Sequence, residues 1–471
     1  MRNSVFALFS LFGLPVLVFS GMSFMGHPLA FAAPALTHPF PLNFEWCVAT
    51  AAHQIEGGNT RSDWWDWEKI PGNIKHGDTA AVATDSWHHM DRDIEMLREL
   101  HVTTYRFSVE WAKIEPLRGQ IDPEAVLHYR LFVEKLRQAK IQPMITLQHF
   151  TLPQWFRALG GWEWEGAPEA FEAYTQVVQR QIAPDARYWV TINEPMVHLL
   201  GGYFLGNVPP QEKRKLKHVI PVMVGLLKAH ARAYHALHHE AENRTHPLQI
   251  QVGMANHLRY FQAAKRFNPL DQFFAREFDL LWNWALPDSL RTGKLTLNVP
   301  ALVHADIAIS GLQGSYDFFG INYYTRDRTS SSLILKELFR SANTPPSAEA
   351  QALYSPENWE SHPEGLEKLL LKTAHRFPGT PIFITENGIA DAKDLKRPGY
   401  LRDHLLAIQR VVQNGAPVQG YCHWSLLDNF EWIHGYGPKF GLFEVNFNTQ
   451  MTTPRMSARQ FSKYAIQNGI D

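Results

Sequence analysis

The sequence has few cysteines and almost no net charge. Of its 471 residues only Cys47 and Cys422 are cysteines, which excludes a zinc site built from cysteines and a framework of several disulfides. Its 45 Lys and Arg side chains are balanced by 46 Asp and Glu, so it lacks the positive field with which proteins attract nucleic acid. Long polar tracts are absent as well, which excludes a largely disordered chain. Nucleic acid is therefore not an expected partner.

Histidine is plentiful, but its spacing does not indicate a metal site. His235, His238 and His239 lie together in a helix predicted over residues 218–242, without the HExxH spacing of zinc enzymes and without a nearby cysteine. We interpret them as part of a solvated helix face. The sequence predicts neither a metal nor a cofactor.

The first 33 residues differ from the rest of the chain. Arg2 precedes an apolar run from Val5 to Met25, and the small residues of segment 30–33 (AFAA) suit cleavage by a signal peptidase. We predict a signal peptide over residues 1–33 and therefore a secreted or periplasmic protein. The run is nearly long enough to cross a bilayer, so an uncleaved membrane anchor is one alternative. A later start at Met22 or Met25, which would give a cytoplasmic protein, is another.

Residues 39–471 are predicted to form one domain. Short β-branched runs alternate with helical patterns, which is typical of parallel βαβ units. Eight such strands with their helices predict an α/β fold, a (β/α)8 TIM barrel with loop insertions at its C-terminal face. The expected strands cover 44–52, 102–108, 141–147, 187–193, 248–256, 316–321, 381–386 and 418–425. Expected helices cover 85–100, 168–182, 218–242, 366–377, 400–413 and 454–467, with another opening at 122–124 and an insertion at 325–359.

Polar side chains stand where the predicted strands end. The C-terminal ends of parallel barrel strands share one face, where loops build the active site. The side chains expected to converge there are Gln54, Arg106, His149, Asn193, Glu194, Asn256, Asn322, Tyr324, Glu386, Asn387 and Trp424.

Two of these residues are carboxylic acids that end strongly apolar runs. Glu194 lies in TINEP and Glu386 in ITENG, on the fourth and seventh predicted strands. Strands four and seven of a barrel can face each other across its mouth, and two carboxyl groups about 5 to 5.5 Å apart are the arrangement for retaining glycoside hydrolysis. From their spacing alone, a pair of barrel-end salt bridges explains the two residues equally well.

Seven sequence blocks occur in a fixed order along nearly the whole chain. They are FEW (44–46) with QIEG (54–57), YRFS (105–108), LPQ (152–154) with GGW (160–162), TINEP (191–195), DFFGINYY (317–324), ITENG (384–388) and WSLLDNFEW (424–432). In this order they resemble glycoside hydrolase family 1, the β-glucosidase family, from about residue 40 to 464. The resemblance implies a retaining β-glycosidase, above all a β-glucosidase, that cleaves terminal β-D-glycosides through a covalent glycosyl-enzyme intermediate.

The resemblance also implies catalytic roles. Glu386 would attack the anomeric carbon, and Glu194 would protonate the leaving oxygen and then deprotonate water. Arg106 and Tyr324 would lower the pKa of Glu386 and aim its carboxylate. Asn193 would donate to the 2-hydroxyl of the sugar.

A further set of residues matches the sugar pocket of the family. Within it, a carboxylate at Glu431 would repel a 6-phosphate, and Glu194 is not replaced by the Gln of thioglucosidases, so a non-phosphorylated oxygen glycoside is the expected substrate. The pocket residues are Gln54, His149, Asn322, Trp424, Glu431 and Trp432.

Two other functions remain open at this stage. One is a non-catalytic barrel that binds sugar or protein, although both glutamates are present. The other is a transglycosidase that uses the same two glutamates. The expected partner is a small-molecule or oligosaccharide β-glycoside, and a membrane only if the N-terminal segment stays attached.

The two cysteines fall on the first and last predicted strands, which are neighbours in a closed barrel. Cys47 and Cys422 can therefore meet, and a disulfide between them is one alternative. Because disulfide geometry is restrictive, we expect two buried thiols instead.

Overall fold

The computed structural model describes residues 38–470 except 215, 300–302 and 339–354. The predicted leader, 1–33, lies outside the described residues. Within the described ranges, no helix has the length and apolar character needed to cross a membrane.

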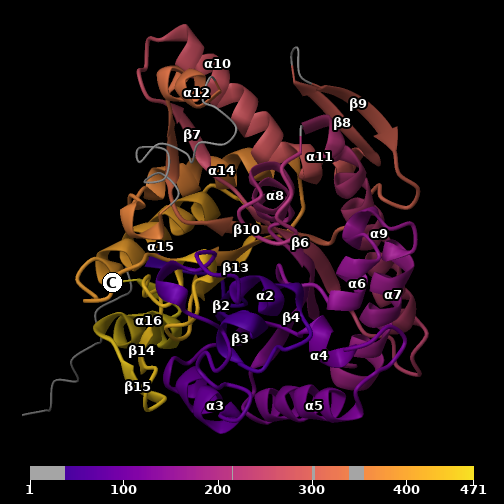
Figure 1. Cartoon of the computed structure of the whole chain (residues 1–471). Helices are drawn as coiled ribbons and strands as arrows, with labels where there is room; N and C mark the ends of the chain where they lie inside the picture. The colour runs from indigo at the N-terminus through magenta and orange to yellow at the C-terminus, as the bar shows by residue number, and fades with distance from the viewer. Residues whose placement is uncertain (1–37, 215, 300–302, 339–354, 471) are drawn as a thin grey trace, which may run out of the picture. The chain divides into compact units, whose positions relative to one another are not determined.

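Eight parallel strands form a closed barrel with helices around it (Figure 1). Around the ring the order is β2, β3, β4, β5, β6, β10, β12 and β13, and β13 pairs with β2 to close it. The predicted barrel is confirmed. Its strands are β2 (Glu45–Ala49), β3 (Thr104–Ser108), β4 (Gln142–Gln148), β5 (Tyr188–Asn193), β6 (Gln251–His257), β10 (Phe318–Tyr323), β12 (Ile382–Asn387) and β13 (Val418–Trp424).

The strands read as continuous apolar runs because both of their faces are covered. Every residue of β3, β5, β10 and β12 is buried, including the polar ones near their C-terminal ends. A layer of large side chains from β4, β5, β6, β10 and β12 forms a packed cluster, as expected inside a barrel. Its members are Met144, Tyr188, Val190, Ala255, Phe318 and Phe383.

The helices follow the strands largely as predicted. Asp122 caps the helix that begins at Pro123, because its side chain accepts from the backbone N–H groups of Glu124 (2.8 Å) and Ala125 (3.2 Å). The chain after α7 continues as a π-helical turn, η3 (Val178–Ile182), within the predicted 168–182. The main helices are α3 (Met90–Glu99), α5 (Pro123–Gln138), α7 (Ala167–Val177), α9 (Ile220–Glu242), α11 (Ala285–Thr292), α14 (Pro363–Arg376), α15 (Arg397–Gln413) and α16 (Met456–Gln467).

The prediction that a helix begins at Asp85 is wrong, because α3 starts at Met90. Asp85 has a φ of 50°, which no helix allows, and its carboxylate pairs with the rings of His88 (2.6 Å) and His89 (3.3 Å). The acidic residue therefore forms a turn ahead of the helix.

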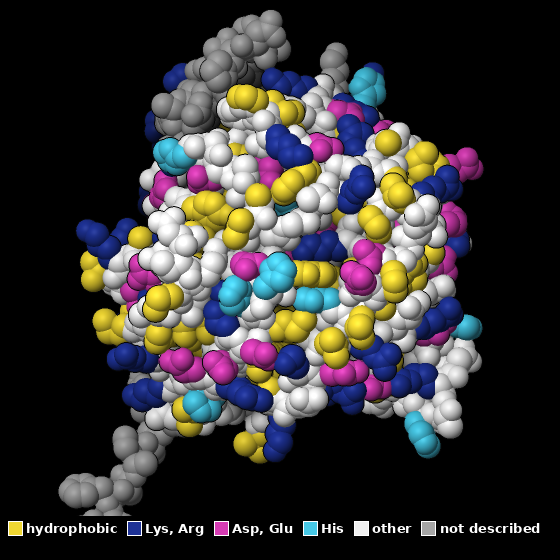
Figure 2. Space-filling view, turned by 60° about the horizontal axis from the view of Figure 1, so that its bottom comes forward, with side chains coloured by type: hydrophobic (Ala, Val, Ile, Leu, Met, Phe, Trp, Pro, Cys, Tyr) yellow, Lys and Arg dark blue, Asp and Glu magenta, His cyan; other side chains and the backbone are white. Residues whose placement is uncertain are grey.

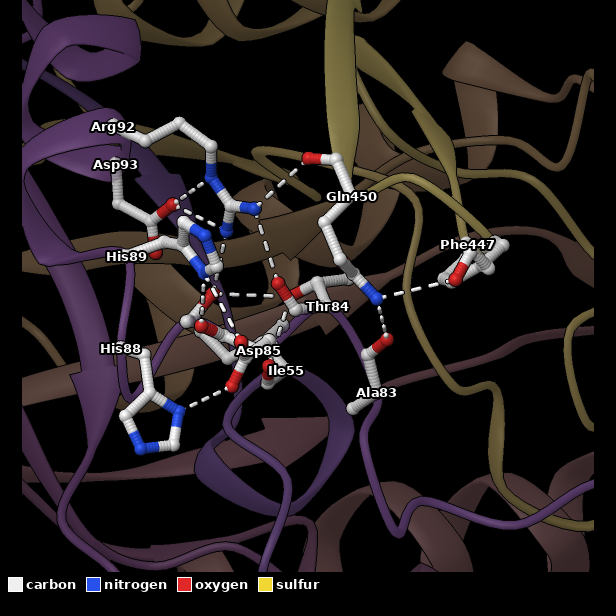
Figure 3. A network of polar contacts seen from close by, with 11 residues as sticks. Ile55, Ala83, Thr84, Asp85, His88, His89, Arg92, Asp93, Phe447 and Gln450 are labelled. Carbon is white, nitrogen blue, oxygen red and sulfur yellow. Dashed lines mark hydrogen bonds and ion pairs between the residues drawn. The ribbon is translucent and has the colours of Figure 1, made fainter.

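A polar network joins this turn to the C-terminal part of the chain (Figure 3). Arg92 donates to the carboxylate of Asp93 (2.8 Å) and to the backbone oxygen of Gln450 (3.3 Å). The Gln450 amide donates in turn to the oxygen of Ala83 (3.3 Å). Gln450 lies between β14 (Phe443–Asn446) and β15 (Met451–Pro454), so the network fastens the loop after the first barrel strand to the segment after the last one.

None of the four two-stranded sheets that the described residues form outside the barrel was predicted. One joins β1 (His38–Pro39) to β16 (Gly469–Ile470), and another joins β14 to β15. The strands β7 (Tyr260–Ala263) and β11 (Arg326–Thr329) pair in parallel, and β8 (Lys294–Val299) forms a hairpin with β9 (Val303–Ala308). The predicted insertion at 325–359 thus contains β11 and α12 (Ser331–Leu338), while 339–354 lies outside the described residues. The four-residue, partly exposed β7 and β11 carry too little hydrophobic periodicity to be seen in a sequence. The alternation of Leu295 and Leu297 in the six-residue β8 was an available signal.

The expectation of two free thiols is wrong. Cys47 on β2 and Cys422 on β13 form a disulfide. They are direct partners in the parallel pairing of these strands, and both lie in one buried cluster with Trp424. The closure of the barrel brings the two side chains together across a sequence separation of 375 residues, at the strand neighbours that the predicted barrel implies.

Charges of both signs are mixed over the surface. On the face shown in Figure 2, Lys and Arg side chains alternate with Asp and Glu, and hydrophobic side chains are scattered between them. This distribution agrees with the balance of 45 basic and 46 acidic residues.

Candidate active site

The two glutamates leave the barrel at the C-terminal ends of their strands. Glu386 is part of β12, whereas Glu194 directly follows β5 and precedes α8 (Pro195–His198). Glu194 has a left-handed backbone with φ 45° and ψ 56°, which is uncommon for a residue with a side chain. Both side chains are buried, with exposed fractions of 6% for Glu194 and 3% for Glu386. Buried carboxyl groups at this end of a barrel are typical of catalytic residues.

Arg106, near the end of β3, connects the two glutamate-bearing strands. Its guanidinium donates to Glu386 Oε1 (2.6 Å), to the backbone oxygen of Thr385 (2.9 Å) and to Asn193 Oδ1 (2.5 Å). The side chain is 1% exposed. Because the guanidinium is planar and fully bonded, Arg106 fixes the relative positions of Glu386 and Asn193.

Tyr324 holds the second oxygen of the Glu386 carboxylate. Its hydroxyl donates to Glu386 Oε2 at 2.6 Å. Each carboxylate oxygen of Glu386 thus has one strong donor, which fixes the plane of the group. This is the arrangement needed for a nucleophile that must present one lone pair in one direction.

Asn322 lies between the two acids. Its backbone is paired with that of Glu386 in the β10–β12 ladder, and its side-chain amide donates to Glu194 Oε1 (2.7 Å) and Asn193 Oδ1 (3.1 Å). The amide oxygen accepts from the hydroxyl of Thr385 at 2.6 Å. Asn322 therefore orients the Glu194 carboxyl group in the structure, in addition to its predicted place in the pocket.

Burial and mutual repulsion give the two acids different proton affinities. Burial, followed by the charge of Glu386, raises the pKa of Glu194 from 4.5 to about 8. Burial also raises the pKa of Glu386, but Arg106 and Tyr324 oppose that rise through direct hydrogen bonds. The expected lowering by Arg106 and Tyr324 is present, yet burial exceeds it. Glu386 is the acid with a guanidinium bound to it, so it is the one that ionises first.

The predicted pocket residues surround this pair. The ring of His149 is stacked near those of Trp424 (centroids 5.8 Å apart) and Trp432 (6.1 Å), and its Nε2 lies 3.1 Å from the amide nitrogen of Asn193. Gln54 donates to the backbone oxygen of Phe430 at 2.8 Å. Rings and amides in this arrangement form a wall suited to the flat faces and the hydroxyls of a sugar.

Glu431 adds a third buried carboxyl group to the pocket. Its Oε1 accepts from the indole N–H of Trp424 at 3.3 Å. Burial, together with the nearby charges of Glu386 and Asp428, raises its pKa to about 8. The same neighbouring charges that disfavour the ionisation of Glu431 also disfavour an anionic ligand beside it.

Not every predicted polar residue faces the site. The amide of Asn256 donates to backbone oxygens of Met254 and Gly320, both at 3.2 Å. Asn387 donates to the oxygen of Tyr323 at 2.6 Å. Both amides serve the barrel itself.

The sequence reasoning missed His257, the last residue of β6. Its Nδ1 lies 3.6 Å from Glu194 Oε2. The sequence places His257 directly after Asn256 at a strand end, which could have marked it as a candidate, but His257 lies in none of the seven blocks.

Two of the clustered histidines of α9 bond to the segment that leads into β10. His238 Nε2 lies 2.8 Å from the carboxylate of Asp317, and His235 Nε2 lies 2.7 Å from the backbone oxygen of Gly311. Over the described part of the chain, no group of three or more His, Cys, Asp or Glu side chains is placed to hold a metal ion.

Comparison with known proteins decides the family. The family model described as Glycosyl hydrolase family 1 matches residues 36–470. The chain belongs to glycosyl hydrolase family 1. It is a glycoside hydrolase, as its relatives are: "Beta-glucosidase A" of Acetivibrio thermocellus is 31% identical over 458 residues, covering 92% of this chain and 99% of that protein.

Solved structures of this glycosyl hydrolase family share the barrel. The β-glycosidase from Pyrococcus horikoshii has a TM-score of 0.79 at 32% identity, covering 92% of this chain and 96% of that one. The β-glucosidase from Thermotoga maritima in complex with glucoimidazole has a TM-score of 0.82 at 28% identity, covering 92% of this chain and all of that one.

Arg106→Lys tests whether the guanidinium organises the site of this family 1 member. A lysine ammonium can replace one of its contacts but not the fork that joins Glu386 to Asn193, so we expect kcat/KM to fall by about 10²-fold or more. The measurement is steady-state hydrolysis of a nitrophenyl glycoside, with circular dichroism to confirm folding. A folded variant within about twofold of wild type would show that Arg106 does not organise the site.

Proposed function

We propose that the protein is a retaining β-glycosidase, above all a β-glucosidase. The observation that carries the proposal is that two buried glutamates have different hydrogen-bond partners and different proton affinities. Arg106 and Tyr324 bind the carboxylate of Glu386, and the pKa of Glu194 is raised to about 8. One acid is thereby suited to attack as an anion and the other to give a proton at neutral pH.

In the first step, a carboxylate oxygen of Glu386 attacks the anomeric carbon as the bond to the leaving oxygen breaks. Glu194 gives its proton to that oxygen, so the aglycone leaves as a neutral alcohol and the sugar remains as an ester of Glu386. Esterification removes the negative charge of Glu386, which had raised the pKa of Glu194. Glu194 is then a carboxylate that can act as a base.

In the second step, Glu194 takes a proton from water while the water oxygen attacks the anomeric carbon. The ester bond breaks, Glu386 leaves as a carboxylate and Glu194 is protonated again. Two inversions at one carbon give a sugar product with the β-configuration of the substrate. Asn193, held by Arg106, is the donor placed for the 2-hydroxyl, where a hydrogen bond strengthens in the transition state.

The proposed substrate is a non-phosphorylated β-D-glycoside. The charges of Glu386 and Asp428 disfavour the ionisation of Glu431, and the same charges would disfavour the negative charge of a sugar 6-phosphate placed beside it. The names of the relatives support glucose: "Beta-glucosidase A" is one, and a β-glucosidase from Thermotoga maritima was solved with glucoimidazole.

The pH dependence of kcat/KM should report the two acids. Glu194 must be protonated for the first step, and burial and Glu386 raise its pKa to about 8, so activity should persist through neutral pH and fall above about pH 8. Deprotonated Glu386 is required as well, which sets the acid limb. Initial rates on a nitrophenyl glucoside across buffers of constant ionic strength measure both limbs. An alkaline limb that already begins below pH 7 would contradict the assignment of Glu194 as the acid.

The stereochemistry of hydrolysis tests the proposal directly. Proton NMR of aryl β-glucoside hydrolysis should show β-glucose first, followed by slow mutarotation. The α-anomer as the first product would overturn the retaining mechanism. Added alcohol or sugar acceptors reveal how far the ester passes to an acceptor other than water, which distinguishes a transglycosidase. The absence of any turnover on a panel of nitrophenyl glycosides would favour a binding barrel.

We further propose that residues 1–33 are a secretory leader and that 39–471 is the catalytic domain. The charged residue, apolar run and small residues of the leader support export, and so does the disulfide between Cys47 and Cys422, because such bonds persist in oxidising compartments. The mass of the protein recovered from its native compartment separates a cleaved leader from an anchor or a later start.

A further inference from the structure

His257 lies beside the proposed acid/base and belongs to none of the residue sets described for this site. It is the last residue of β6, the strand that follows β5 in the ring, and the backbone N–H of Glu194 donates to Ala255 of the same strand at 2.8 Å. This backbone bond holds Glu194 beside the C-terminal end of β6, where His257 lies. The His257 Nδ1 is 3.6 Å from Glu194 Oε2.

The imidazole of His257 is buried without a hydrogen bond. Its side chain is 9% exposed, and neither Nδ1 nor Nε2 has a hydrogen-bond partner within the described residues. A buried polar group without a partner costs free energy, and in native proteins such a group often marks a functional site. The ring is also held in place, since it lies edge-on to Trp282 and Tyr324.

The oxygen that faces His257 is the one that exchanges the proton. Asn322 donates to Glu194 Oε1 at 2.7 Å, so Oε1 is already occupied as an acceptor. In a carboxylic acid the carbonyl oxygen is the better acceptor, so the bond from Asn322 to Oε1 favours the proton on Oε2. Proton transfer to the leaving group and from water therefore takes place at the oxygen beside His257.

We propose that His257 is a positioning residue for Glu194, whose Nδ1–H stabilises Oε2 as that oxygen gains negative charge, and thereby favours substrates with poor leaving groups. The inference rests on the proposed function of Glu194. A separation of 3.6 Å exceeds a hydrogen bond, but it is too short for an intervening water, and contacts of catalytic groups shorten when substrate binds.

The electrostatic surroundings keep His257 uncharged. Burial, followed by Arg259, holds the pKa of His257 well below its usual value, so the imidazole is neutral. In the proposed tautomer its hydrogen is on Nδ1, the nitrogen that faces Glu194. The other groups that act on Glu194 are Glu386 from β12, Arg106 from β3 and Arg259 from the segment after β6, together with the Asn322 amide from β10. Loss of the neutral donor therefore leaves the charges around Glu194 unchanged and removes one stabilising contact of its anion.

The test compares two substrates in His257→Phe. A phenyl glycoside needs its leaving oxygen protonated, whereas a 2,4-dinitrophenyl glycoside leaves without help. We expect kcat/KM for the phenyl substrate to fall by about tenfold or more and that for the dinitrophenyl substrate to change by less than about twofold. The alkaline limb should move to higher pH, because the Glu194 anion has lost a donor.

Two further variants separate positioning from a disturbance of the strand end. His257→Asn places an amide N–H near the position of Nδ1 and should restore most of the phenyl activity. His238→Phe makes the same substitution at a histidine of α9 that bonds Asp317 instead of Glu194, and should leave the ratio of the two substrates unchanged.

The outcomes distinguish this inference from the proposed function. If the wild-type enzyme is active and His257→Phe loses activity equally on both substrates, or loses none, the inference alone is overturned. A wild-type protein that hydrolyses neither glycoside overturns the inference together with the function on which it rests.

Discussion

Glu386→Ala is expected to abolish turnover, with kcat lowered by at least about 10⁴-fold on every β-glycoside substrate. The alanine has no atom that can attack the anomeric carbon, and the donors of Arg106 and Tyr324 are left facing a space instead of a carboxylate. Steady-state and single-turnover assays on a nitrophenyl glucoside measure the loss. Because no ester can form, the variant should show no burst of nitrophenol even with the best leaving group.

The matched control is Glu134→Ala. Glu134 lies on α5 at the surface and pairs with Arg130, so the same substitution there should leave kcat unchanged. A fluorinated glucoside that traps the ester should label wild-type Glu386 and fail to label the variant. Retention of wild-type activity by Glu386→Ala, or a label on another residue, would refute the assignment of the nucleophile.

Glu194→Ala is expected to lower kcat by about 10²- to 10⁴-fold, and by an amount that depends on the leaving group. Formation of the ester on Glu386 needs an acid only when the leaving oxygen is basic, whereas its hydrolysis always needs a base. With a dinitrophenyl glucoside, a burst should therefore be followed by very slow turnover, and KM should fall as the ester accumulates. Phenyl glucoside should be almost inert.

A small nucleophile should restore turnover of the Glu194→Ala variant. Azide needs no base and fits the space left by the carboxyl group, so it should release the ester as a β-glycosyl azide. Glu431→Ala is the informative comparison, because it removes another buried carboxyl group of the same pocket that carries no proton to the aglycone. Rescue of both variants by azide, or of neither, would argue against Glu194 as the acid and base.

The sequence specifies the barrel because its strands and helices repeat a simple pattern. All eight barrel strands were located within a few residues, since each is a short apolar run buried on both faces. Motifs at strand ends identify both glutamates together with Arg106 and Tyr324. The structure brings Arg106 and Tyr324 into direct contact with Glu386, and Glu194 is held nearby by Asn322. The start of α3 was misplaced because the φ of 50° at Asp85 depends on contacts with His88 and His89.

Other features depend on distances that only the closed barrel creates. Burial raises the pKa of Glu386 by more than Arg106 lowers it. Residue types alone do not reveal this balance between desolvation and charge. His257 gains its significance from a separation of 3.6 Å across two strands. The strands β7 and β11 are short and partly exposed, so each is formed only through its backbone pairing with the other.

The disulfide between β2 and β13 makes the barrel a covalent ring. The backbone from residue 47 to 422 and the bond between the two sulfurs form a closed loop that contains every main helix named above except α16. A protease cut in any surface loop within that span would open the loop without releasing a fragment. Since Cys422 lies on β13, the last barrel strand in chain order, the bond can close only after all eight barrel strands have been synthesised.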